Sequence, residues 1–297
     1  MTPFAAAVTV GRLVLPMPGA DLPACDHARC AERLEAELTA LRATLTTGPP
    51  AACLPPDGEA DRVRHRWFTG HHAAFTVWQL LARGLSTLAA TPEAAATLPI
   101  AWTTALYDVY SVLFLYAAGC TPEQYATLLH PRMAAAHPAF SCGWARDHTP
   151  VPAALDAARD SHRAAALDRL SDAVKDNQRV HMAVARRLVP DGSSPLRQAG
   201  RSPGPEPTEA EQALHDAHFR VERQPLCGPV HRAQLVRLLN LCLADIGAYG
   251  LGPLPDGCPE RFGRESVARL IAVAVCEEPP ARNAPPKIPN PTKGRTT

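Results

Sequence analysis

The stretch VKDNQRVHMAVARRLVPDGSSP, residues 174–195, decides the fold class and raises the first functional question. Its apolar residues and those just before it recur at steps of three and four, which is the pattern of a helix with one buried face. Asn177 and His181 fall on that face, and a Gly-Ser-Ser loop follows at 192–194. Because burying an unpaired imidazole costs about 1–3 kcal/mol, His181 needs a hydrogen-bond acceptor, a metal or a cofactor.

The same periodicity extends over most of the chain. Alanine and leucine are frequent and β-branched runs are short, which favours helices. We therefore expect an all-α fold in which residues 1–278 form one helical domain and the proline-rich, basic segment 279–297 is a disordered tail. Further helices are predicted over about 26–45, 61–90 and 230–248, from Pro122, from about Pro152 through 188, and from the capping box Thr208-x-x-Glu211.

Composition excludes several classes of partner. Lys and Arg total 30 against 29 Asp and Glu, so no overall charge favours nucleic acid or an anionic membrane. The first sixteen residues lack the basic lead of a signal peptide. The apolar run at 100–119 is interrupted by polar residues, as in a core helix rather than a membrane span. We expect a cytoplasmic protein.

The nine cysteines are irregularly spaced and odd in number. In a chain of 297 residues this favours reduced thiols over a disulfide framework. The segment Cys25-x-His27-x-x-Cys30 has the spacing of half a zinc site, but no second ligand pair at a suitable distance completes it. A zinc ion is therefore not expected.

A second histidine stands out among the twelve. His72 follows Phe68 by four residues and precedes Phe75 by three, so a helix places the three side chains on one face. An imidazole framed by aromatic rings could belong to an apolar pocket with one proton donor. Alternatively, the group is an ordinary aromatic core cluster.

Three segments together resemble the tryptophan 2,3-dioxygenase-like haem proteins, and they occur in the order found in that family. The first is Phe-x-x-x-His-x-x-Phe-x-x-Trp at 68–78. The second is Thr-Pro-x-x-Tyr at 121–125, followed by AFSCGWAR at 139–146 with a spacing two residues longer than in the family. The third is RVHMAVAR at 179–186, followed by the Gly-Ser-Ser loop.

The resemblance implies a helical bundle around a haem, and it assigns roles to the matching residues. A neutral imidazole is a suitable axial ligand of haem iron, and Asn177 is a candidate acceptor for its second nitrogen. A distal imidazole can move protons, and a guanidinium can bind a carboxylate. The implied roles are proximal iron ligand for His181, distal acid–base catalyst for His72, substrate binding for Arg146, Ser193, Ser194 and Phe75, and haem contact for Phe68 and Trp144.

Within this superfamily, the chain is most similar to bacterial haem-dependent L-tyrosine hydroxylases. These use hydrogen peroxide to hydroxylate the ring ortho to the phenol, giving 3,4-dihydroxyphenylalanine for natural products. A related branch acts on 3-methyltyrosine and attaches its haem through a cysteine four residues after a histidine. Ala185 occupies that position after His181, so the resemblance implies non-covalent haem b. Tyrosine and peroxide would be the small-molecule partners, and a homodimer is expected.

Two other functions stay open at this point. One is a dioxygen-dependent haem enzyme that acts on tryptophan or another indole. The other is a haem-free helical binding or scaffold protein in which His72 and His181 only pack.

Overall fold

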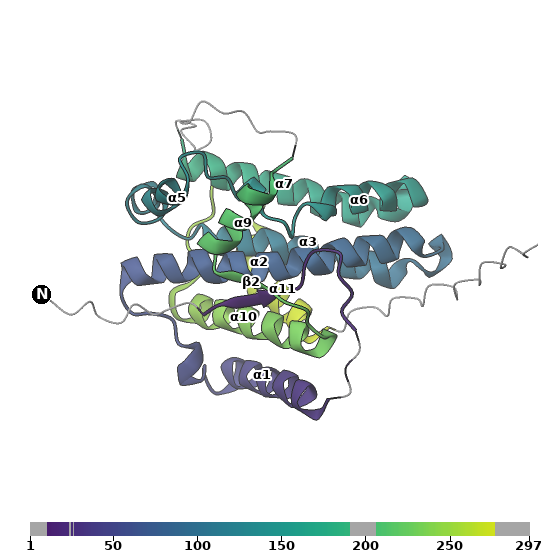
Figure 1. Cartoon of the computed structure of the whole chain (residues 1–297), viewed down its shortest axis with the longest axis horizontal. Helices are drawn as coiled ribbons and strands as arrows, with labels where there is room; N and C mark the ends of the chain where they lie inside the picture. Colours follow the sequence, from purple (N-terminus) through teal and green to yellow (C-terminus); the bar gives the residue numbers. More distant parts are fainter. Residues whose placement is uncertain (1–10, 24, 26, 191–205, 277–297) are drawn as a thin grey trace, which may run out of the picture.

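The computed structural model describes residues 11–23, 25, 27–190 and 206–276, and this part of the chain is mostly helical, as predicted (Figure 1). Ser193, Ser194 and the predicted tail lie outside the described residues. The long helices are α1 (Ala28–Thr46), α2 (Glu59–Ala90), α3 (Thr97–Ala117), α6 (Pro150–Ser161), α7 (Asp168–Leu188), α9 (Glu209–His218), α10 (Gly228–Tyr249) and α11 (Arg261–Val275).

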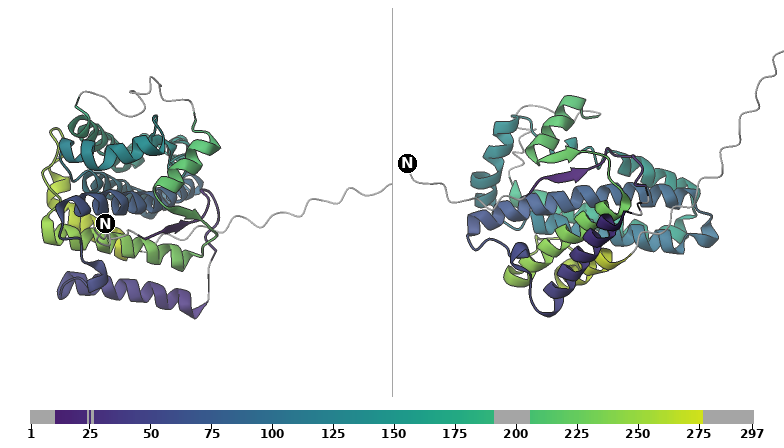
Figure 2. Two further views of the ribbon diagram at one scale, coloured as in Figure 1. Left: turned by 60° about the vertical axis from the view of Figure 1, so that its left-hand side comes forward. Right: turned by 60° about the horizontal axis from the view of Figure 1, so that its bottom comes forward.

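The helices form layers on both sides of a central hairpin made by α2 and α3 (Figures 1 and 2). On one side, α6 packs against α2 and α7 packs against α3. On the other side, α10 and α11 cover the hairpin, and α1 packs against the outer face of α10. Because it is covered on both sides, α2 is buried along most of its length.

Glycine allows the two helices of the hairpin to approach closely. A Cβ atom at Gly70 would lie 2.8 Å from the Cβ of Ala117, and one at Gly84 would lie 3.0 Å from a methyl group of Thr103. A larger residue at Gly70 would therefore push α2 away from α3.

Helix α3 covers the apolar run predicted to be a core helix. It is the one helix in the described part of the chain that is long and apolar enough to cross a membrane, and 67% of its most apolar window is buried in the fold. The burial agrees with a place in the core.

Short elements connect the helices, including a small pair of strands that the sequence analysis did not predict. Strands β1 (Leu13–Leu15) and β2 (Val221–Arg223) pair in parallel, with Leu13 opposite Val221. The capping box predicted at Thr208 is present and starts α9. A second capping box, at Thr121, starts α4. The remaining elements are η1 (Ala51–Cys53), η2 (Glu93–Ala95), α4 (Pro122–Gln124), η3 (Tyr125–Leu129), α5 (His130–Ala136), η4 (Cys142–Trp144) and η5 (Ala164–Leu167).

The predicted helix after Pro152 is two helices rather than one. Helix α6 ends at Ser161, where His162 adopts an extended backbone and its ring hydrogen-bonds the carbonyl of Leu88. The 3₁₀ turn η5 then redirects the chain into α7. Helix α11, which the sequence analysis missed, closes the far side of α3.

Candidate active site

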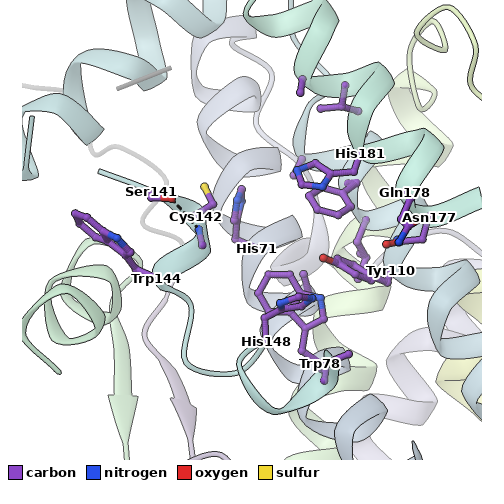
Figure 3. A pocket seen from close by; sticks show the side chains of 18 of the residues that line it. His71, Trp78, Tyr110, Ser141, Cys142, Trp144, His148, Asn177, Gln178 and His181 are labelled. Carbon is purple, nitrogen blue, oxygen red and sulfur yellow. Dashed lines mark hydrogen bonds between the residues drawn. The ribbon is translucent and has the colours of Figure 1, made fainter. Parts of the chain in front are cut away.

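A cavity of about 970 Å³ lies between the central hairpin and the α6–α7 layer (Figure 3). Its volume is at the upper end of the roughly 300–1,000 Å³ typical of ligand sites. The turn at 141–144 and the segment at 206–211 also contribute to its wall. The wall is mainly apolar, and its aromatic members are Trp67, Trp78, Tyr107, Tyr110, Phe114, Tyr125 and Trp144.

Helix α2 presents one stripe of residues to this cavity, and His71 is its titratable member. The Nδ1 atom of His71 lies 2.6 Å from the carbonyl oxygen of Trp67, one turn earlier, and donates to it. This bond fixes the tautomer, so Nε2 keeps a free lone pair. Burial lowers the pKa of His71 to about 3, so the ring is neutral at pH 7.

The structure places His71, not the adjacent His72, in the cavity wall. His72 is 2% exposed, and its Nε2 lies 2.6 Å from the carbonyl oxygen of Phe219, to which it donates. Successive residues of a helix point about 100° apart, so the two rings face different sides of α2. The distal role predicted for His72 therefore does not match its position, which is that of a satisfied core histidine.

Of the two predicted aromatic neighbours of His72, Phe68 lies beside its ring, with centroids 6.5 Å apart, whereas Phe75 contacts the ring of His71 at 6.0 Å. Phe68 and Phe75 pack against Phe219, with ring centroids 5.9 Å and 5.2 Å away. The described cavity wall contains neither of them. The pattern at 68–78 therefore marks a cluster of core residues on a helix. The haem contact predicted for Phe68 and the substrate contact predicted for Phe75 do not match their positions outside the cavity wall.

His181 on α7 does line the cavity, where it is exposed. Its ring stacks on Phe114, with centroids 4.8 Å apart and planes 12° from parallel. Among the described residues, none hydrogen-bonds this imidazole, whereas Asn177 is buried and donates to the hydroxyl of Ser111. The surrounding cavity wall still keeps part of the solvent from the ring, and this desolvation lowers the pKa of His181 and favours the neutral form. It is therefore available to a ligand, unlike a core histidine.

A third cavity histidine, His148, was not singled out by the sequence analysis. Its ring packs edge-on against Trp78, with centroids 5.0 Å apart, and lies 6.2 Å from Tyr110 (Figure 3). Burial, with a smaller contribution from His181, lowers the pKa of His148 to about 4. The available signal was its place in the irregular segment 137–152, because long ordered loops often carry function.

Arg146 already has carboxylate partners. Its guanidinium donates to Glu209 at 2.7 Å and 2.8 Å and to Asp216 at 3.0 Å. It also lies outside the described cavity wall, in which Arg159 is the one arginine or lysine. The structure therefore does not leave Arg146 free to bind the carboxylate of a substrate. Trp144, in the same segment, does line the cavity.

The cavity fits a haem by size and by donor set. It is large and mostly aromatic, and it carries His71 and His181, two neutral imidazoles with nitrogen lone pairs not used by the described protein. An imidazole is a common axial ligand of haem iron. The Ala185 methyl group also lines the cavity, one turn after His181.

Comparison with known proteins identifies the family. No curated protein matches the chain closely enough to count as a relative. The family model described as SfmD 3-methyl-L-tyrosine peroxygenase matches residues 5–173, which include α2, α3, α6 and the loop that carries His148. His181 and Ala185 follow the end of the match. Because the match covers more than half of the sequence, the chain belongs to the SfmD 3-methyl-L-tyrosine peroxygenase family.

Proposed function

We propose that the protein is a haem-dependent peroxygenase that hydroxylates tyrosine at the ring carbon ortho to the phenol, in natural-product biosynthesis. Its substrate is L-tyrosine or the 3-methyl derivative named in the family description. The observation that carries the proposal is the presence of His71 and His181 in the wall of one large aromatic cavity. The peroxygenase family favours this reaction over the dioxygen-dependent opening of an indole ring.

His181 would be the ligand of the haem iron. No described side chain occupies its ring nitrogens, and its helix forms one wall of the cavity. The haem is held without a thioether bond, because the residue four positions later is Ala185. When bound, haem would activate hydrogen peroxide, which is the oxidant, so that one of its oxygen atoms is transferred to an aromatic ring and the other leaves as water.

His71 takes the acid–base role that the sequence pattern assigned to His72. With Nδ1–H bonded to Trp67, its Nε2 can accept a proton from an O–H group in the cavity, either of hydrogen peroxide or of the phenol. The lowered pKa means that His71 starts neutral and returns a captured proton readily. The bond to the helix backbone holds the ring in one orientation while it does so.

Arg159 is the proposed partner of the substrate carboxylate, in place of Arg146. It lines the cavity near the end of α6, with Asp156 one turn earlier at 3.4 Å. A guanidinium pairs well with a carboxylate, and the neighbouring Asp156 could bind the ammonium group. The rings of Trp78, Tyr107 and Tyr110 would then surround the phenol and exclude water.

Product analysis tests the proposal directly. The haem-loaded protein is incubated with hydrogen peroxide and with L-tyrosine, 3-methyl-L-tyrosine or L-phenylalanine, which lacks the phenol. We expect a product one oxygen atom heavier from at least one of the two phenols and none from phenylalanine. No oxygenated product from either phenol with peroxide would contradict it, and so would a product two oxygen atoms heavier in a parallel incubation with tryptophan and dioxygen.

A further inference from the structure

Three cysteines from two distant segments of the sequence meet at the N-terminal ends of two helices, away from the cavity. The sulfur atoms of Cys25, Cys30 and Cys227 all lie within 4.8 Å of one another, and each residue is half-buried. Cys25 and Cys30 belong to the segment that resembled half a zinc site. The fold supplies from Cys227 a ligand that sequence spacing could not reveal.

One backbone hydrogen bond joins the two segments, and a second one shapes the turn at the start of α1. The amide of Gly228 donates to the carbonyl of Pro23 at 3.1 Å, and the amide of Cys30 donates to the carbonyl of His27 at 2.9 Å. Cys30 lies in the first turn of α1, and Cys227 is the N-cap residue of α10. Two helix N-termini therefore converge on the thiols, where their dipoles would stabilise the negative charge of metal-bound thiolates.

We propose that Cys25, Cys30 and Cys227 bind a zinc ion through their sulfur atoms and that this ion joins the start of α1 to the start of α10. In a tetrahedral site with Zn–S bonds of about 2.3 Å, sulfur atoms lie roughly 3.8 Å apart, so the cluster needs only small side-chain movements. Binding converts the thiols to thiolates and releases their protons to solvent. Water or the exposed His27 of the same turn completes the four ligands.

The packing of α1 explains what such an ion would stabilise. Leu41 is the one fully buried residue of this helix, and Leu34 and Leu38 add partly buried contacts to the core. These contacts leave the N-terminal turn of α1 without an apolar anchor. The described cavity wall takes no residue from α1 or α10, so the ion is a structural one and is independent of the proposed haem chemistry.

The number of thiols favours a metal over a disulfide. A disulfide between two of them would leave the third unpaired, whereas one soft cation satisfies all three.

Metal analysis of the purified full-length protein, expressed with added zinc, tests the proposal. We expect about one zinc per chain, with three sulfur neighbours at about 2.3 Å in zinc-edge X-ray absorption. Cys30→Ser should bind zinc at least about tenfold more weakly, since even indirect support of a ligand is worth that much. The matched control Cys258→Ser, outside the cluster, should keep its zinc.

A second measurement covers the case in which the variants fold poorly. Chelator-treated wild-type protein should unfold at a lower temperature, and zinc alone should restore the original value. Absence of stoichiometric zinc in both the purified and the zinc-reconstituted reduced protein would overturn the proposal. Full zinc retention in Cys30→Ser and Cys227→Ser would overturn it as well.

Discussion

Both sides of α2 carry polar residues, but these residues differ in how many of their polar atoms have a hydrogen-bond partner. On the core side, Arg66, His72 and Gln79 each have partners at hydrogen-bond distance. On the cavity side, His71 uses one nitrogen to fix its orientation and leaves the other without a partner among the described residues. Burial alone therefore does not identify a functional histidine. The number of unused polar atoms facing a cavity is the better criterion.

The largest effect is expected on the core side, at the buried pair of Arg66 and Asp245. Arg66 donates to both carboxylate oxygens of Asp245, at 2.8 Å and 2.9 Å, and Tyr116 donates to the same group. Asp245→Ala should lower the free energy of unfolding by about 3–5 kcal/mol, because it leaves a buried guanidinium without its counter-ion. Urea-induced unfolding measures this loss.

The surface pair of Arg64 and Asp61 provides the control. Its side chains are 31% and 48% exposed, so Asp61→Ala should change the free energy of unfolding by less than about 1 kcal/mol. Equal losses in the two variants would show that the core side of α2 is not held by its ion pair.

On the cavity side, His71→Phe should lower the peroxide-dependent turnover by about 10²- to 10⁴-fold, the usual contribution of a general acid–base group. Haem content and thermal stability should stay close to those of the wild type, because the ring makes its described hydrogen bond only to its own helix. Steady-state kinetics and an absorption spectrum measure these two effects separately.

The adjacent residue gives the matched control. His72→Phe should lower the free energy of unfolding by about 1–3 kcal/mol, since the Phe219 carbonyl loses its donor, while turnover changes little. The reverse pattern, with turnover lost at His72 and kept at His71, would restore the role predicted from the sequence.

Lowering the pH should reduce the free energy of unfolding because of the buried His72. Burial lowers the pKa of His72 to about 4, against about 6.5 when unfolded, so the unfolded chain binds the extra proton between these values. Its contribution to stability is therefore complete above pH 6.5 and is lost as the pH falls, by roughly 2 kcal/mol at pH 5. Unfolding at pH 7 and pH 5 should show a smaller pH dependence for His72→Phe than for the wild type. Equal pH dependence would contradict the lowered pKa.

The smallest effect is expected at the partly exposed Arg159. Arg159→Ala should raise KM for the amino acid about tenfold, the loss expected for one charged hydrogen bond, with kcat little changed. Arg163→Ala, whose partner is the surface Glu93, should leave KM unchanged. A loss of haem in Arg159→Ala, with normal KM in the loaded protein, would assign Arg159 to the cofactor instead.

The comparison also shows what the sequence could predict. Residue spacing located α2, α3 and α10 within a few residues, because long periodic segments carry a strong signal. It also placed Phe68 beside His72, whereas the ring of Phe75 contacts His71. Spacing gives only relative directions around a helix, however, and not which face meets a cavity. That choice depended on residues far away in the sequence: the backbone carbonyl of Phe219 accepts from His72, while the ring of Phe219 stacks on His71.

Two other predictions were also decided by contacts between residues that are far apart in the sequence. Arg146 carried the expected charge, but Glu209 and Asp216 neutralise it, and neither is close to it in the sequence. Cys227 completes the thiol cluster in the same way. A single sequence shows which residues have reactive or charged side chains. The fold decides which of these side chains already have a hydrogen-bond or ion-pair partner within the protein.

The assignment of His181 to the iron and His71 to proton transfer is the central claim, and ligand rescue tests it most directly. His181→Gly and His71→Gly are each purified, loaded with haem and titrated with imidazole while the absorption and electron paramagnetic resonance spectra are recorded. We predict that His181→Gly loses the wild-type ligation and that imidazole restores it, while His71→Gly keeps a wild-type spectrum throughout. A wild-type spectrum in His181→Gly, with imidazole-dependent ligation in His71→Gly, would contradict the account.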